Sequence, residues 1–228
     1  MNTMTRNLFA ALLFAAATVF AQQKPIPFEG EILKFEASDK TNPPPRQAVL
    51  FLGSSSIRMW KNVAKDIPDY RVINRGFGGS QIVDSIHYAE RIVFPYEPSA
   101  IVFYAGGNDI NAGKSAETVF ADFQTFAQKV HAKLPKTKIA FISVAPNPAR
   151  WSQITRIRRA NELIENFTRT DSRLSFIDAH PQMLGADGQP KPDIFMPDRL
   201  HMNEKGYAIW KQIVGDHLKG IDIQAAKK

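Results

Sequence analysis

The stretch that decides the fold is Ala48-Val49-Leu50-Phe51-Leu52-Gly53-Ser54-Ser55-Ser56. Five consecutive apolar residues predict a fully buried strand of a parallel sheet, and glycine and three serines follow it at once. Open α/β folds bind their ligands at the carboxyl ends of such strands. One of the three serine hydroxyls is therefore a candidate nucleophile, and a helix N-cap is the alternative interpretation of the same residues.

The rest of the chain alternates short apolar runs with helical patterns. Apolar residues recur at spacings of three and four between residues 119 and 134, as on the core face of a helix. Residues 152–168 and 203–218 also have helical patterns, and Asn203 is suited to cap the second. The expected strands are 48–52, 70–74, 100–104, 138–144 and 174–177. This alternation predicts an α/β fold, a three-layer α/β/α sandwich around a mostly five-stranded parallel sheet.

The first residues have the features of a signal peptide. Arg6 precedes an apolar run from Leu8 to Phe20, and Ala21 completes a small-residue cleavage pattern. The run has about 13 residues, whereas a membrane span needs roughly 20. We therefore expect residues 1–21 to be removed and the protein to be exported, to the periplasm or the medium. An uncleaved anchor is the alternative.

Length and composition indicate one domain and exclude several kinds of site. Residues 22–46 are polar and Pro-rich, which predicts an extended lead-in segment before a domain over 47–228. The chain has no cysteine, which rules out thiol nucleophiles, thiolate metal sites and a lipoprotein anchor. The net charge is +7, but the basic residues are scattered, and nucleic-acid binding is not expected. One basic cluster is typical of a solvated helix face: Arg150, Arg156, Arg158 and Arg159.

Two glycine-rich segments follow the second and third predicted strands. Asn74-Arg75-Gly76-Phe77-Gly78-Gly79-Ser80 can point backbone N–H groups into a cleft, and a plain tight turn is the alternative. A nucleotide site is disfavoured because neither GxxxxGK[ST] nor GxGxxG is present. Gly106-Gly107-Asn108-Asp109 places an asparagine amide where it can donate to a developing oxyanion. An Asx turn or helix cap is the alternative there.

Asp198-Arg199-Leu200-His201 supplies a candidate base late in the chain. When aspartate and histidine lie side by side on a tight turn, the carboxylate accepts from one ring nitrogen and leaves the other free. His180, two residues after Asp178, is the rival base. Three other histidines fall in helical stretches and are expected at the surface: His87, His131 and His217. A metal site is a weaker alternative, without HExxH spacing to support it, built from Asp178, His180, Asp198 and His201.

Taken in order, the four motifs resemble those of the SGNH hydrolases, also called the GDSL esterase/lipase family. The resemblance runs from about Ala48 to Trp210 and implies the flavodoxin-like SGNH hydrolase fold. It implies a catalytic triad of Ser55, Asp198 and His201 and an oxyanion hole formed by Ser55, Gly79 and Asn108. Ser54 stands where the family usually has aspartate. That position is not part of the triad, so the departure bears on local hydrogen bonds rather than on activity.

The resemblance implies hydrolysis of carboxylic esters through an acyl-enzyme, without a metal or organic cofactor. Acetylated carbohydrates, other short acyl esters and lysophospholipids are the implied substrate classes. The sequence has no long apolar insertion that could form a lid, which favours short or acetyl groups. Trp151 is expected either to line the cleft or to anchor the next helix. Stable membrane insertion is not expected, the oligomeric state stays open, and a non-catalytic carbohydrate-binding module is the competing class.

Overall fold

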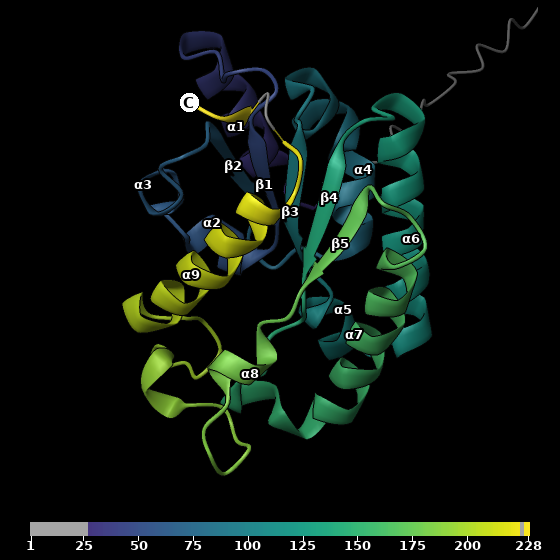
Figure 1. Cartoon of the computed structure of the whole chain (residues 1–228). Helices are drawn as coiled ribbons and strands as arrows, with labels where there is room; N and C mark the ends of the chain where they lie inside the picture. The colour runs from purple at the N-terminus through teal and green to yellow at the C-terminus, as the bar shows by residue number, and fades with distance from the viewer. Residues whose placement is uncertain (1–26, 224–225) are drawn as a thin grey trace, which may run out of the picture.

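The computed structural model of the protein describes residues 27–223 and 226–228. Its centre is one sheet of five parallel strands in the order β2-β1-β3-β4-β5, which confirms the predicted fold class (Figure 1). The strands are β1 (Val49–Gly53), β2 (Val72–Gly76), β3 (Ala100–Tyr104), β4 (Lys138–Ile142) and β5 (Leu174–Ile177). β2 begins two residues later than predicted, because Tyr70 instead forms an antiparallel bridge with Lys227.

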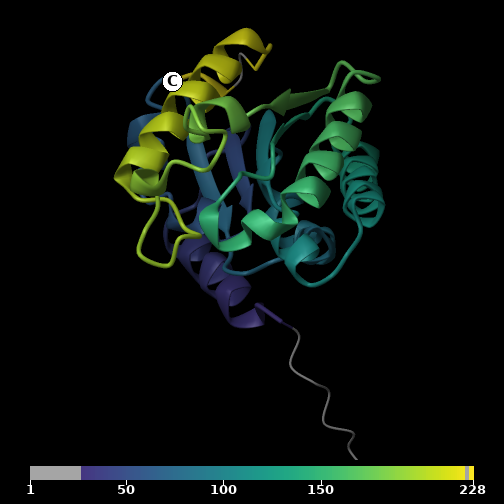
Figure 2. The ribbon, with the colours of Figure 1, turned by 90° about the horizontal axis from the view of Figure 1, so that it is seen from below.

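Helices cover both faces of the sheet. One face packs against α1, α4, α6 and α7, and the other against α2, α3 and α9, so that two apolar cores lie on either side of the strands (Figure 2). The helices are α1 (Glu29–Thr41), α2 (Ser55–Met59), α3 (Val63–Asp66), α4 (Ile82–Ile92), α5 (Gly107–Asn111), α6 (Ala116–Lys133), α7 (Ile154–Thr168), α8 (His180–Met183) and α9 (Glu204–Gly220). Between them lie the 3₁₀ turns η1 (Phe94–Tyr96), η2 (Pro148–Gln153) and η3 (Pro192–Ile194). Among the described residues, no helix is long and apolar enough to cross a membrane.

The two long helices with the clearest sequence patterns form as predicted. The apolar face of α6 is fully buried, and Phe126 stacks on Phe103 of β3 with 4.4 Å between the ring centroids. Stacked and edge-on aromatic pairs of this kind add to the stabilisation from burial alone. Asn203 caps α9, because its side-chain oxygen accepts from the backbone N–H groups of Lys205 and Gly206.

The extended conformation predicted for residues 22–46 is wrong over α1. The proline run Pro43-Pro44-Pro45 follows the helix, which ends at Thr41. Few residues of α1 are apolar, but Ile32 is fully buried, and Arg91 of α4 binds the carboxylates of both Glu29 and Glu36 at 2.6–2.9 Å. Contacts with a distant helix therefore hold α1 in place, and such contacts leave no local pattern in the sequence.

The strand register brings three of the predicted motifs to one edge of the sheet. Gly53, the last residue of β1, is paired with Gly76 of β2 on one side and Tyr104 of β3 on the other. Gly53 has a φ of 132°, and a Cβ there would lie 1.9 Å from the Tyr104 carbonyl oxygen, so only glycine fits. The segments that begin at Ser54, Phe77 and Ala105 therefore leave the sheet side by side.

Candidate active site

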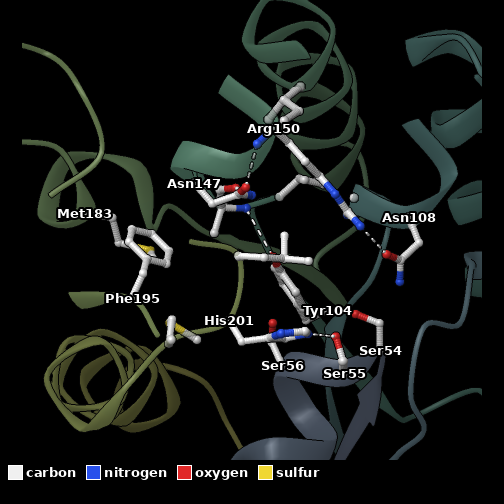
Figure 3. Close-up of a pocket in the computed structure, with 16 residues that line it drawn as sticks. Ser54, Ser55, Ser56, Tyr104, Asn108, Asn147, Arg150, Met183, Phe195 and His201 are labelled. Carbon is white, nitrogen blue, oxygen red and sulfur yellow. Dashed lines mark hydrogen bonds between the residues drawn. The ribbon is translucent and has the colours of Figure 1, made fainter. Parts of the chain in front are cut away.

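Ser55 is the first residue of α2, at the carboxyl end of β1. Its Oγ lies 2.9 Å from Nε2 of His201, and neither neighbouring serine makes this contact (Figure 3). Ser54 occupies the N-cap position but makes no side-chain capping bond, and its side chain is largely buried. A serine therefore does stand at the helix N-cap, but without the capping bond, and the contact with His201 singles out Ser55 among the three hydroxyls.

His201 and Asp198 lie on the tight turn that the sequence predicted. Nδ1 of His201 is 2.6 Å from Oδ2 of Asp198, while Oδ1 of the same carboxylate accepts from the backbone N–H groups of Leu200 and His201 at 2.9 Å. Arg199 adopts the left-handed conformation, with a φ of 60°, to close the turn. Burial opposes ionisation of Asp198, but these hydrogen bonds outweigh it and lower the pKa of the carboxyl to about 2.

Asn108 lies on α5, directly after β3, and its amide faces the cavity beside Ser55 (Figure 3). Nδ2 of Asn108 donates to the Ser80 carbonyl at 3.0 Å, and Oδ1 accepts from Nη2 of Arg150 at 3.0 Å. An amide nitrogen carries two hydrogens, so one N–H of Asn108 remains for a ligand. The Asx-turn alternative for this residue is not observed, because the amide binds residues far away in the sequence.

Two backbone N–H groups, those of Ser55 and Gly79, are the other expected donors. The N–H of Ser55 stands at the first position of α2, where no intrahelical acceptor exists. Gly79 has a φ of 77° and open space around it, so its N–H belongs to an exposed turn. The turn is held from α1, because Glu31 accepts from the N–H of Gly78 at 3.2 Å. With Asn108 they are the three donors that the family resemblance implies for an oxyanion hole, and of the three residues only Gly79 is not among those that line the cavity.

The cavity at this edge is small, with room for about 30 Å³. Tyr104 lies at its base, and burial raises the pKa of the phenol. Apolar side chains form the wall away from Asn108, with Met183 and Phe195 at that side (Figure 3). The lining residues are Ser54, Ser55, Ser56, Tyr104, Gly107, Asn108, Val144, Ala145, Asn147, Arg150, Ile157, Met183, Phe195, Leu200, His201 and Met202.

The loop after β4 contributes Arg150 to the cavity, and of the two alternatives for Trp151 the position in the cleft is not observed. Trp151 is not among the lining residues, and its ring instead lies 5.9 Å from the Arg158 guanidinium carbon. Arg150 lines the cavity, so the solvated face predicted for the basic cluster is wrong at this position. The sequence gives one indication that Arg150 could reach the site: it lies two residues after Pro148, in a loop at the carboxyl edge of the predicted sheet.

Asp109, the neighbour of Asn108, is a fully buried carboxylate. It accepts from the N–H of Ile82, at the start of α4, and from Nζ of Lys114 at 2.8 Å. Burial raises the pKa of Asp109 in spite of the hydrogen bond and charge of Lys114, which act in the opposite direction. This ion pair fixes the short helix that carries Asn108, a role that the sequence pattern did not indicate.

The other histidines lie away from Ser55. His180 is the rival base, but it is not among the cavity residues, and its Nδ1 is 3.8 Å from Asp178. His87 is exposed, as predicted. The surface position predicted for His131 and His217 is wrong, because both are half-buried. His131 is hydrogen-bonded to the Thr137 carbonyl and His217 to the Ser175 hydroxyl. Over the part of the chain that the structure describes, no three acidic or histidine side chains gather to hold a metal ion, which contradicts the metal alternative.

Comparison with known proteins decides the family. Residues 52–209 match the model of the GDSL-like lipase/acylhydrolase family. The chain belongs to that family. The match covers all four motifs, so the resemblance inferred from the sequence is confirmed, and the GDSL-like chain is an ester hydrolase of the SGNH type.

Relatives and solved structures agree with the family assignment. The GDSL-like chain is 26% identical over 187 residues to the platelet-activating factor acetylhydrolase IB subunit alpha1 of Bos taurus, covering 76% of this chain and 75% of the relative. It resembles the structure of a GDSL-like lipase from Bacteroides thetaiotaomicron, with a TM-score of 0.69 and 18% identity over 83% of this chain and 97% of the other. It also resembles a carbohydrate esterase family 3 structure from Talaromyces cellulolyticus, with a TM-score of 0.62 and 18% identity over 78% and 98%.

Proposed function

We propose that the protein is a serine esterase in which Ser55 is the nucleophile, His201 the base and Asp198 the residue that orients the base. The observation that carries this proposal is the unbroken chain of hydrogen bonds from Asp198 through His201 to Ser55, at 2.6 and 2.9 Å. A hydroxyl is a weak nucleophile at neutral pH and needs an adjacent base. His201 meets that need, because Asp198 stays ionised and binds Nδ1, leaving Nε2 free to accept a proton.

The first half-reaction forms an acyl-enzyme. Nε2 of His201 takes the proton from Ser55 Oγ as the oxygen attacks the ester carbonyl carbon, and negative charge develops on the carbonyl oxygen. The N–H groups of Ser55 and Gly79 and the amide of Asn108 then stabilise this oxyanion. Collapse of the intermediate breaks the bond to the alcohol oxygen, which takes the proton from His201 and leaves as a neutral alcohol.

The second half-reaction releases the acid. Water gives a proton to His201 and attacks the acyl carbonyl, and the same three donors stabilise the second oxyanion. His201 then returns the proton to Ser55, which restores the enzyme. Each step uses only side chains and backbone groups of this chain.

For the substrate we propose short-acyl or acetyl esters, with acetylated carbohydrates as the leading class. The small size of the cavity, and its lining by apolar side chains such as Met183 and Phe195, support a small acyl group. The names of two of the similar proteins, an acetylhydrolase and a carbohydrate esterase, support the same choice. A lysophospholipase- or lipase-type acylhydrolase is the second candidate, because one of the similar structures is named a GDSL-like lipase.

We also propose that the protein acts outside the cytoplasm. The proposal rests on the charged and apolar pattern of residues 1–21, which lie outside the described residues. Size comparison of the mature protein with the full-length chain after expression tests it, since cleavage after Ala21 removes a peptide of 21 residues. A protein that retains Met1 and stays in the cytosol contradicts the proposal.

Ester hydrolysis by purified variants tests the catalytic roles. We expect S55A and H201A to lose 4-nitrophenyl acetate hydrolysis, and S56A to keep it, since Ser56 lines the same cavity but does not contact His201. H180A should match the wild type. Activity that survives in S55A contradicts the proposal, and a folded wild type without any esterase activity favours the binding module.

A series of 4-nitrophenyl esters of increasing chain length, run beside acetylated xylan, tests the substrate class. We expect kcat/KM to be flat or to fall with acyl length, and the polysaccharide to release acetate. A value that rises steadily toward long acyl chains contradicts the short-acyl proposal and supports the lipid-like alternative.

A further inference from the structure

Arg150 reaches into the catalytic cavity from the 3₁₀ turn η2. Asn147 holds the start of this turn, because its Oδ1 accepts from the N–H of Arg150 at 3.0 Å. The turn is also bound to the loop that carries the catalytic histidine, since the N–H of Ala149 donates to the Arg199 carbonyl at 3.1 Å. The backbone of Arg150 is thus fixed against two other parts of the active site.

The guanidinium of Arg150 is directed at Asn108. Nη2 donates to Oδ1 of Asn108 at 3.0 Å, and Nη1 lies against Gly107, where a Cβ would come within 3.4 Å of it (Figure 3). Burial lowers the pKa of Arg150, but an arginine remains a cation in proteins. Within residues 27–223 and 226–228, no carboxylate forms an ion pair with it, whereas Arg159 of the same cluster pairs with two.

The two hydrogen bonds of Asn108 require opposite ends of its amide. The Ser80 carbonyl can only accept, so it needs the amide nitrogen, and Arg150 can only donate, so it needs the amide oxygen. If the amide rotated by half a turn, its NH₂ group would face the guanidinium of Arg150, which also donates. Its oxygen would then face the Ser80 carbonyl, which also accepts. Arg150 therefore helps to fix which end of Asn108 faces the cavity.

The same contact strengthens the remaining N–H of Asn108 as a donor. A cation bound to the oxygen of an amide draws electron density away from its nitrogen, and this polarisation is larger in a half-buried site than in water. Fixed donors contribute more to stabilising an oxyanion than donors that must reorient during the reaction. Both effects raise the turnover number rather than the affinity for the ester.

We propose that Arg150 is a positioning residue of the oxyanion hole, which holds and polarises the Asn108 amide so that its free N–H points at the developing oxyanion. The inference rests on the proposed esterase function. It extends that function to a residue on a different loop, contributed by the chain after β4. It also predicts that Arg150 acts through Asn108 and not through the substrate.

A double-mutant cycle with two readouts tests this inference. The variants are R150M, R150K, N108A and N108A/R150M, with R159M as the matched control from the exposed face of the same cluster. One readout is kcat and KM for 4-nitrophenyl acetate. The other is the rate at which a fluorophosphonate labels the enzyme, which reports oxyanion stabilisation without depending on the natural substrate.

We expect R150M to lower both kcat and the labelling rate by about tenfold and to leave KM within about twofold, since a misplaced donor costs up to about 100-fold. R150K, which keeps the charge, should recover part of the loss, and R159M should equal the wild type. In the N108A background, R150M should cause no further loss. Thermal unfolding of each variant separates a loss of fold from a loss of function, and R150K remains informative if R150M does not fold.

Three results overturn the inference. Equal labelling of R150M and wild type removes the positioning role, and additive losses in the double variant show that Arg150 acts without Asn108. As a third comparison, the anionic ester 4-acetoxybenzoate is assayed beside the neutral ester phenyl acetate. If R150M loses activity on 4-acetoxybenzoate only, Arg150 instead recognises an anionic substrate. Failure of the proposed function itself would look different. In that case the wild type would neither hydrolyse esters nor react with the fluorophosphonate.

Discussion

Removal of the Asn108 amide is the sharpest perturbation of the proposed oxyanion hole. Asn108→Ala takes away one of three donors and leaves the backbone N–H groups of Ser55 and Gly79 in place. Loss of one such donor raises the activation free energy by about 3 kcal/mol in serine hydrolases. Because each 1.36 kcal/mol is a factor of ten, kcat should fall by about 100-fold or slightly more.

The structure also predicts which kinetic constant changes. In the proposed oxyanion hole, the free N–H of Asn108 donates to an oxygen that becomes charged only in the transition state, so KM for 4-nitrophenyl acetate should stay within about threefold. Asn111→Ala is the matched control, because Asn111 lies on the same short helix but its side chain is exposed and binds Gln153. A fall in kcat of less than about threefold in N108A, or an equal fall in N111A, would refute this account of the oxyanion hole.

Four further predictions follow from individual contacts. Glu31→Ala should lower kcat several-fold while Glu31→Gln retains most of it, because the Gly78 N–H needs an acceptor on α1; equal loss in both contradicts this. Lys114→Met should lower the free energy of unfolding in urea by about 3 kcal/mol at pH 8, since it leaves the buried Asp109 carboxylate without its cation. The loss should be smaller at pH 4, because burial raises the pKa of Asp109 and favours its neutral form; an equal loss at both pH values contradicts this. The wild type should have a higher Tm than D198N above about pH 4, and this difference should vanish as the pH falls toward 2, because folding lowers the pKa of Asp198 to about 2. A difference in Tm that persists at pH 2 contradicts this. His180→Ala should leave the pH profile of kcat/KM unchanged, because His180 does not line the cavity; loss of activity in this variant would identify His180 as the base.

The sequence predicts those parts of the fold and site that local patterns encode. Buried runs such as Ala100–Tyr104 mark the strands, and the spacing of Asp198 and His201 marks a turn whose two side chains meet. The choice of Ser55 as the nucleophile depends on the order of four motifs along the chain. Ser54 and Ser56 offer the same chemistry, and only the place of His201 in three dimensions distinguishes them.

Long-range polar contacts account for what the sequence does not predict. Arg150 belongs to a basic cluster by its neighbours, and only the packing of η2 beside α5 brings its guanidinium to Asn108, 42 positions earlier. The helix α1 depends on Arg91, 55 positions beyond Glu36. Polar residues such as these have no periodicity that separates a solvated side chain from one bound to a distant partner.

The central claim is that Ser55 is the nucleophile, and peptide mapping of the fluorophosphonate adduct by mass spectrometry tests it most directly. Residues 54, 55 and 56 are all serine, so fragmentation must place the adduct on a single residue. The account predicts one adduct, on Ser55, that forms much more slowly in H201A and not at all in S55A. An adduct on Ser54 or Ser56 of the wild type, or undiminished labelling of S55A, would contradict it.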